Sequence, residues 1–183
     1  VQLALAGLLH RTETAVLAEA GATGLLVMGP LSNRSWRRFF HGTTLDQAVH
    51  GSQCPLLVVR RAALRPYAQV LVAVDLSPVS MPLIDFAGRF STPTMLTLFH
   101  AIDTIEESRL RSASVSFEAM QANRLGTRQH ARTRLLQVIG ALGIPDDDPP
   151  AFDVGNGDPA YSTALQQQAI RADLVVVGRR RRS

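Results

Sequence analysis

The sequence predicts an α/β fold, with a doubly wound, mostly parallel sheet in each of two tandem, pseudo-symmetric domains. Two observations predict it. Short runs of consecutive apolar residues, typical of strands buried on both faces, alternate with stretches of helical periodicity. The chain also repeats itself, because residues 1–29 align with residues 150–178 at an offset of 149. A period of about 150 residues is the size of a globular domain rather than of a solenoid unit.

The repeat sets the expected domain boundaries. Residues 1–63 are predicted to be the C-terminal part of a first domain, and residues 64–183 a second domain that lacks its own C-terminal part. The apolar runs at 25–28 and 174–177, each followed by glycine, are the best matched segments. Neither repeat is whole, so we expect the sequence to be part of a tandem protein, incomplete at both ends.

The elements of the first repeat follow from its apolar runs. We predict a short strand at 3–6, a helix at 13–20, a buried strand at 25–28, a helix at 42–49 and a strand at 56–59. Residues 60–66 are expected to link the two repeats. Cys54 precedes Pro55 at the start of the last strand, so we interpret it as a buried structural thiol.

The second repeat continues the alternation. A strand at 70–74 precedes a helix that starts at Ser77-Pro78 and runs through Arg89, with Pro82 in its first turn. A strand at 95–99 and a long helix at 114–142 come next, and then a strand at 151–154, a helix at 161–171 and a strand at 174–177. The apolar residues of the long helix recur at helical spacing: Val115, Ala119, Ala122, Leu125, Leu135, Val138 and Ile139.

Composition predicts a soluble protein of the cytoplasm. Hydrophobic residues make up 46% and charged residues 19% of the sequence, which are ordinary values for a globular domain. No apolar run approaches the roughly 18 residues of a membrane span, and no secretory leader opens the chain. We therefore expect no membrane partner.

The positive charge is concentrated at one end. All 19 basic residues are arginine, and the four at 179–182 account for the whole formal charge of +4. A nucleic-acid-binding protein usually spreads its basic residues along one face of a recognisable module, so this function is not favoured. The lack of lysine excludes a phosphate-binding Walker A loop and a Schiff-base nucleophile within these residues.

Parallel α/β sheets bind ligands beyond the carboxyl ends of their strands, where the strand order reverses. The strand at 25–28 is followed by Gly29 and, after an arginine-bearing loop, by Gly42, Thr43 and Thr44. Glycine allows a ligand close to the backbone, and free N–H groups at a helix N-terminus attract phosphate. Alternatively, one threonine simply caps the helix and the loop is solvated.

These residues resemble the universal stress protein family. Gly29-x2-Ser32-x9-Gly42-Thr43 is similar to that family's nucleotide loop, Gly-x2-Gly-x9-Gly-Ser/Thr. The segment 53–59 resembles the family's closing strand, 70–78 its opening strand and 98–102 its second strand. The resemblance covers nearly the whole chain and implies a Rossmann-like fold related to adenine-nucleotide hydrolases. The offset of 149 residues suits the family's tandem members.

The resemblance implies an adenine-nucleotide site. Asp75, at the end of the opening strand, would contact adenine or ribose, and Ala101 would line the adenine pocket. The phosphates of ATP or AMP, with Mg²⁺ as an accompanying ion, would lie against the loop residues Gly29, Ser32, Gly42, Thr43, Thr44 and Gly178. The chain departs from the pattern where Ser32 and Arg181 replace a glycine. A side chain there opposes a positive φ, although an arginine can itself meet phosphate.

The functional expectation has two versions. The first is a stress-response protein that senses or binds an adenine nucleotide and pairs with another domain through its closing strand, between Leu56 and Val59. The second is an interaction protein that kept the fold and lost the site. Catalysis has little support beyond slow, incidental ATP hydrolysis, because the five histidines lack the paired spacing of metal sites. Asp75 is either a base or the acceptor of a structural hydrogen bond from the next turn.

Overall fold

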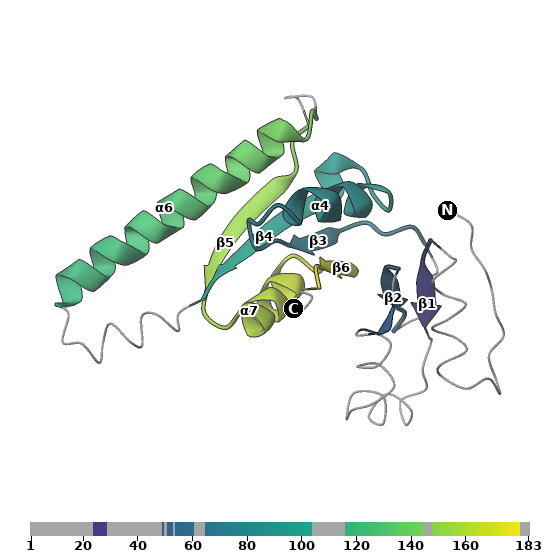
Figure 1. Cartoon of the computed structure of the whole chain (residues 1–183), viewed down its shortest axis with the longest axis horizontal. Coiled ribbons are helices and arrows are strands. Elements are labelled where there is room, and N and C mark those ends of the chain that lie inside the picture. The colour runs from purple at the N-terminus through teal and green to yellow at the C-terminus, as the bar shows by residue number, and fades with distance from the viewer. Residues whose placement is uncertain are drawn as a thin grey trace, which may run out of the picture. The chain divides into compact units, whose positions relative to one another are not determined.

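A computed structural model describes residues 24–28, 49, 51–52, 54–60, 65–103, 116–144 and 148–179 (Figure 1). The chain divides into two compact units, Val1–Leu64 and Arg65–Ser183. That the two units are repeats of one domain stays a prediction. The strand predicted at 3–6 and the helix predicted at 13–20 lie outside the described residues, as does all but the last residue of the helix predicted at 42–49.

In the first unit, two short strands form a parallel pair. β1 (Leu26–Met28) and β2 (Leu56–Val58) pair in the register Leu26 to Leu56. The backbone N–H of Leu26 donates to Pro55 O at 2.9 Å, and that of Val59 donates to Met28 O at 2.7 Å. Both strands predicted here, at 25–28 and 56–59, are therefore confirmed to within one residue.

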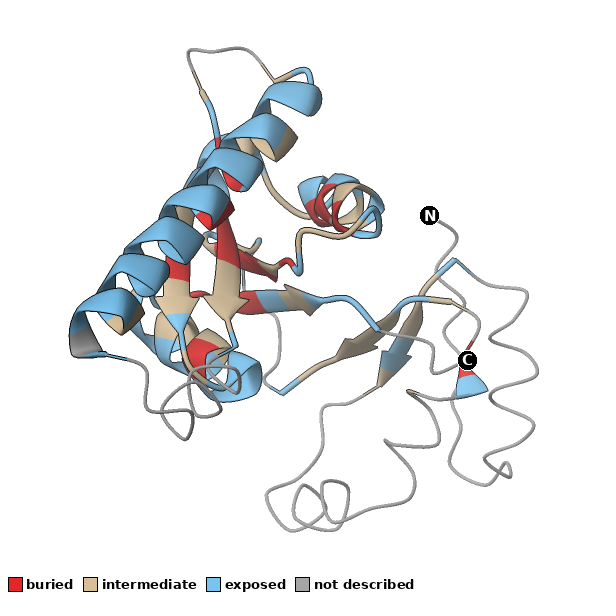
Figure 2. Ribbon diagram, turned by 60° about the vertical axis from the view of Figure 1, so that its left-hand side comes forward, coloured by how far each residue is buried: buried red, intermediate tan, exposed pale blue. Residues whose placement is uncertain are grey.

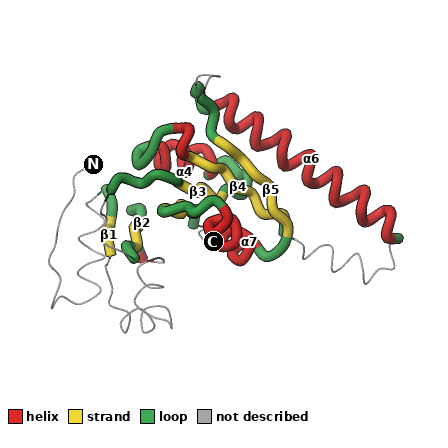
Figure 3. Tube along the Cα trace, turned by 180° about the vertical axis from the view of Figure 1, so that it is seen from behind, coloured by secondary structure: helices red, strands yellow, loops and turns green. Residues whose placement is uncertain are grey.

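The second unit is built on a four-stranded parallel sheet with the order β5-β4-β3-β6. In chain order the elements alternate between strand and helix (Figure 3). They are β3 (Val70–Ala73), α4 (Ser80–Gly88), the 3₁₀ turn η1 (Pro93–Met95), β4 (Leu96–Ile102), α6 (Phe117–Ala141), β5 (Ala151–Asn156), α7 (Pro159–Ala169) and β6 (Leu174–Val177). The predicted α/β class and parallel sheet are confirmed.

The helices cover both faces of this sheet. The chain steps from β3 to β4 to β5 in one direction and then returns past β3 to β6. Since parallel crossovers are right-handed, α4 and α6 lie on one face and α7 on the other (Figure 1). Among the described residues, none of the helices combines the length and the apolar composition that a membrane span requires.

The core lies against the two inner strands (Figure 2). On the α7 face, Leu71, Phe99 and Ala172 form one buried cluster. Successive residues of a strand point to opposite faces, so the alternate positions serve the face beneath α4 and α6. The buried residues of that face include Val70, Val72, Leu96, Leu98 and Val154 from the sheet and Ile84, Ala87, Ala131 and Leu135 from the helices.

The start of α4 differs from the prediction. The helix begins at Ser80 rather than at Ser77-Pro78, because Ser77 and Ser80 first form a turn in which the Ser80 N–H donates to Ser77 O at 2.9 Å. Leu76, with φ of 60°, reverses the chain just before that turn. Pro82 still falls in the first helical turn, where its missing N–H costs nothing.

Two strands extend further toward their carboxyl ends than predicted. β4 runs to Ile102, which the family resemblance of 98–102 implied but the apolar run at 95–99 did not, and β5 runs to Asn156 rather than Val154. The two strands pair over their whole common length, from Thr97 with Ala151 to Ile102 with Asn156. The extra residues are half-buried or exposed, so they lack the run of buried apolar residues on which the prediction depended.

Helix α6 confirms the predicted long helix, and the apolar residues that recur along it are not all buried. Ser116 caps it by accepting from the Ala119 N–H at 3.2 Å. Leu135 is fully buried, whereas Leu125 is 70% exposed. A helix of 25 residues is about 37 Å long, but a six-residue strand spans only about 20 Å. The amino-terminal half of α6 therefore lies beyond the sheet.

A reciprocal set of hydrogen bonds around Asp173 joins the amino ends of β3 and β6. We call this end of the strands the amino edge of the sheet. The Asp173 carboxylate accepts from the N–H groups of Ala68 at 3.0 Å and Gln69 at 3.1 Å. In return, the Asp173 N–H donates to Gln69 O at 3.0 Å. Partial burial raises the pKa of Asp173, but these backbone donors and the charge of Arg65 outweigh it, so the pKa is lowered.

We predict that Asp173→Asn destabilises the protein at neutral pH and that this deficit disappears in acid. The folded-state pKa is below the unfolded value of about 3.9, so the stabilising contribution is present above that value and is lost as the pH falls through the folded pKa. The effect is modest because Asp173 is exposed. Urea unfolding of both proteins between pH 7 and pH 3 measures it. A deficit that stays constant across this range contradicts the account.

We also predict that Gly155→Ala destabilises the second unit. A Cβ at Gly155 would lie 2.6 Å from Cζ of Phe99, whose ring is buried against β5. Overpacking of this kind costs about 1–3 kcal/mol of unfolding free energy. The matched control is Gly126→Ala in α6, where nothing lies within 4 Å and alanine is expected to stabilise the helix by roughly 0.5–1 kcal/mol. Equal effects of the two substitutions in denaturant unfolding would refute this packing.

Candidate functional site

The point where the strand order reverses lies between β3 and β6. From β3 the chain crosses to β4 on one side, and it returns to β6 on the other. In open α/β sheets, ligands bind beyond the carboxyl ends of the strands at such a point. The residues that follow β3 and β6, together with the end of β4, are therefore the candidate site.

Three of the predicted site residues lie together at this edge. β3 pairs with β4 and β6 so that Ala73 lies beside both Phe99 and Val177. Asp75 follows Ala73 by two residues, and Ala101 follows Phe99 by the same number. Gly178 is the first residue after Val177. The three residues therefore occupy the ends of three adjacent strands.

Asp75 is held by the turn that follows β3. Its Oδ1 accepts from the Ser77 N–H at 3.0 Å and from the Ser80 hydroxyl at 3.3 Å. Ser80 is only 2% exposed, so its hydroxyl is a fixed donor, whereas Asp75 itself is exposed. The structural hydrogen bond to the next turn, one of the two interpretations of Asp75, is present.

Leu76, between Asp75 and Ser77, has a backbone conformation that its residue type disfavours. Its φ of 60° lies in the left-handed region, which costs a non-glycine residue roughly 1–2 kcal/mol. Such strain persists only where the surrounding structure imposes it, and it gathers at functional sites. Here the strained residue lies inside the turn whose Ser77 N–H donates to the Asp75 carboxylate.

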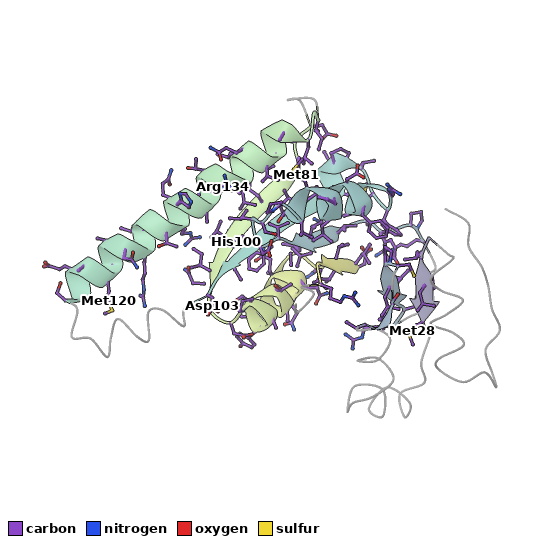
Figure 4. The ribbon with its side chains drawn as sticks, in the orientation of Figure 1. Met28, Met81, His100, Asp103, Met120 and Arg134 are labelled. Carbon is purple, nitrogen blue, oxygen red and sulfur yellow. The ribbon has the colours of Figure 1, made fainter. Side chains whose placement is uncertain are left out.

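His100, on β4, forms a hydrogen bond with the loop that follows β3. Its Nδ1 lies 2.9 Å from the carbonyl oxygen of Val74, the residue before Asp75. A carbonyl can only accept, so Nδ1 carries the hydrogen. His100 lies on the last part of β4, and Asp103 follows the end of that strand (Figure 4). Neither His100 nor Ser80 was predicted from the sequence, although the spacing Asp75-x-Ser77-x-x-Ser80 is a detectable signal for Ser80.

The end of β5 completes this edge of the sheet. Gly157, with φ of 119°, turns the chain from β5 toward α7, a conformation that suits glycine. The Ser162 hydroxyl donates to Asn156 O at 3.2 Å, and Asp158 caps α7 by accepting from the Tyr161 N–H at 2.8 Å. The donors of this turn, the Ser162 hydroxyl and the Tyr161 N–H, are therefore engaged in hydrogen bonds within the protein.

Gly178 has a different role from the glycine in that turn. It carries no positive φ, and a Cβ there would have Leu83 Cδ2 as its nearest neighbour, at an ordinary contact distance of 3.6 Å. The fold itself therefore does not require a glycine at this position. A glycine that packing does not demand, at the carboxyl end of a strand, leaves its backbone open to a ligand.

The remaining predicted site residues cannot be placed. Gly29, Ser32, Gly42, Thr43 and Thr44 lie outside the described residues, and so does Arg181. Within the part of the chain that the structure describes, no three side chains of His, Cys, Asp or Glu gather as metal ligands do.

Comparison with solved structures gives the same fold. The hypothetical protein MJ0577 matches with a TM-score of 0.52 at 16% identity, over 64% of this chain and 78% of that protein. A universal stress protein from Archaeoglobus fulgidus matches with a TM-score of 0.58 at 17% identity, over 91% of this chain. The match spans 55% of the archaeal protein's length. The comparison with curated proteins gave no match.

The sequence also matches a family model directly. The model of the universal stress protein family aligns with residues 66–183, which begin just before β3 and include Asp75, Ala101 and Gly178. Because this match extends over more than half of the chain, the chain belongs to the universal stress protein family.

Proposed function

We propose that this protein binds an adenine nucleotide, ATP or AMP, at the carboxyl edge of the β5-β4-β3-β6 sheet and acts as a stress-response sensor in the cytoplasm. The observation that carries the proposal is the position of Asp75, Ala101 and Gly178 on adjacent strand ends, where the strand order reverses. Family membership supports the stress-response role.

Each of the three residues would contact the part of the nucleotide that suits its own chemistry. The Asp75 carboxylate accepts hydrogen bonds from ribose hydroxyls or the adenine amino group. Ala101 is small, apolar and half-buried, so it offers a flat surface to the base. Gly178 lets a phosphate approach the backbone. Mg²⁺ would accompany the phosphates, and any hydrolysis is slow, because no nucleophile or base is assigned to the site.

Self-association through β2 is part of the same proposal. Among the described residues β2 pairs only with β1, and its three residues are half-buried. An edge strand with this exposure can add a strand from another domain. The competing function, a protein of this fold that binds partners without a nucleotide, gains support only if the titrations below show no binding.

We predict that ATP and AMP bind saturably to the purified full-length protein and that Asp75→Asn weakens both by roughly tenfold or more, the usual effect of losing a hydrogen bond to a charged group. The matched control is Asp85→Asn, which removes the same charge from an exposed position on α4. Isothermal titration calorimetry measures both variants. The absence of any saturable heat from folded wild-type protein would overturn the proposal.

A second prediction separates binding from stability. Gly178→Ala is expected to leave the melting temperature unchanged, because the added Cβ meets Leu83 at an ordinary distance and the backbone is unstrained. The same methyl group would stand between the backbone and a phosphate, so ATP affinity is expected to fall by about tenfold. Thermal unfolding and calorimetry of one sample test both. Unchanged affinity would remove Gly178 from the site.

A further inference from the structure

The amino-terminal half of α6 presents an exposed surface that the nucleotide site does not use. Residues 121–130 are all exposed, and the buried residues of this helix, Ala131 and Leu135, lie in its second half (Figure 2). Met120 marks the projecting end of the helix, and Arg134 lies further along it (Figure 4). Ten consecutive exposed helical residues form a surface long enough to meet a partner.

This helix is strongly basic. Residues 117–141 contain the arginines Arg124, Arg128, Arg132 and Arg134 and a single acidic residue, Glu118. From residue 119 to residue 141 the sequence contains no aspartate or glutamate. The helix therefore carries a net positive charge that its own sequence does not balance.

Four exposed residues form one line along the helix. At about 100° per residue, Leu125, Arg128, Arg132 and Leu136 fall within an arc of roughly 80° and span about 16 Å. We name these four residues the α6 stripe. Leu125 is 70% and Leu136 is 55% exposed. The Arg132 guanidinium lies 5.3 Å from the centre of the Phe152 ring, a cation–π contact that holds it in place.

We propose that the α6 stripe docks an acidic amphipathic helical segment of a partner protein. Two apolar side chains with two guanidinium groups between them match a helix that carries leucine-like residues and carboxylates on one face. Arginine favours carboxylate partners because its planar group makes two parallel hydrogen bonds. The two leucines supply the apolar anchors of the interface.

Other occupants fit the α6 stripe less well. A nucleic-acid backbone offers phosphates but nothing apolar for Leu125 and Leu136. A membrane surface needs a broad apolar face, whereas these leucines are flanked by the exposed Gln121 and Gln129. A second copy of the chain would bring an arginine-rich surface against itself.

A synthetic peptide tests the proposal. The probe is a fluorescent 21-residue helical peptide with leucine at its a and d positions and glutamate at e and g, and the reference is the same peptide with lysine in place of glutamate. We expect the full chain to bind the acidic peptide saturably and not to bind the basic peptide. Raising the salt concentration from 50 to 500 mM is expected to weaken binding of the acidic peptide at least about tenfold. No binding of the acidic peptide overturns the proposal.

Two charge reversals locate the surface. Arg128→Glu lies in the α6 stripe, whereas Arg134→Glu lies about 160° from its centre and makes the same charge change. We expect Arg128→Glu to weaken peptide binding by about tenfold or more and Arg134→Glu by less than about twofold, with equal melting temperatures. Equal effects of the two variants would show nonspecific attraction and refute the docking surface.

Leu125→Ser distinguishes the kinds of partner. It is expected to weaken binding of the acidic peptide severalfold, because it removes an apolar anchor. Duplex DNA and vesicles of phosphatidylserine and phosphatidylcholine are measured alongside. Binding of either one as tightly as the peptide, or peptide binding that ignores Leu125, would contradict the assignment of an acidic protein segment.

Discussion

The central position of β3 determines the arrangement of the second unit. β3 is an inner strand of this sheet and pairs in parallel with β4 on one side and with β6 on the other, and the strand order reverses between β3 and β6. Its first three residues are fully buried because helices cover both faces. The same pairing places Asp75 between the ends of β4 and β6. The packing that stabilises the sheet thus also positions the candidate site.

The two edges of the sheet have different roles. At the amino edge, Asp173 and Gln69 exchange hydrogen bonds and lock the starts of β6 and β3 together. At the carboxyl edge, neighbouring donors hold the Asp75 carboxylate and the Val74 carbonyl, and Asp75 lies at the surface beside the strained Leu76. The side-chain hydrogen bonds that join β3 to β6 are thus at the amino edge, and the preorganised carboxylate of Asp75 is at the carboxyl edge. This division is common where a rigid sheet presents a binding loop.

The sequence predicted the strands well where burial is continuous. The run at 174–177 has the bounds of β6, because four consecutive apolar residues indicate a buried strand. The exposure of Leu125 was not predictable from periodicity, since it depends on the length of α6 relative to the strands that it covers. The later start of α4 depends on the left-handed Leu76, and leucine gives no signal for that conformation.

The candidate site was predictable in part. Strand ends and the family resemblance together indicated Asp75, Ala101 and Gly178, which the fold brings to one edge. The contact of Ser80 with Asp75 did have a signal in the sequence, the spacing Asp75-x-Ser77-x-x-Ser80. The contribution of His100 was missed because it depends on a contact with Val74 O that only the fold creates. The α6 stripe was hidden for a related reason, since helical spacing alone does not say which of the recurring apolar residues stay exposed.

The most direct test of the account is a nuclear magnetic resonance titration of the labelled full-length protein with ATP. The account predicts that the largest amide shift changes occur at the carboxyl edge, at Asp75, Ser77, Ala101, Asp103 and Gly178, while the amides of Ala68, Gln69 and Asp173 at the amino edge stay unchanged. Shift changes centred on the amino edge or on α6, or no changes at saturating ATP, would contradict it.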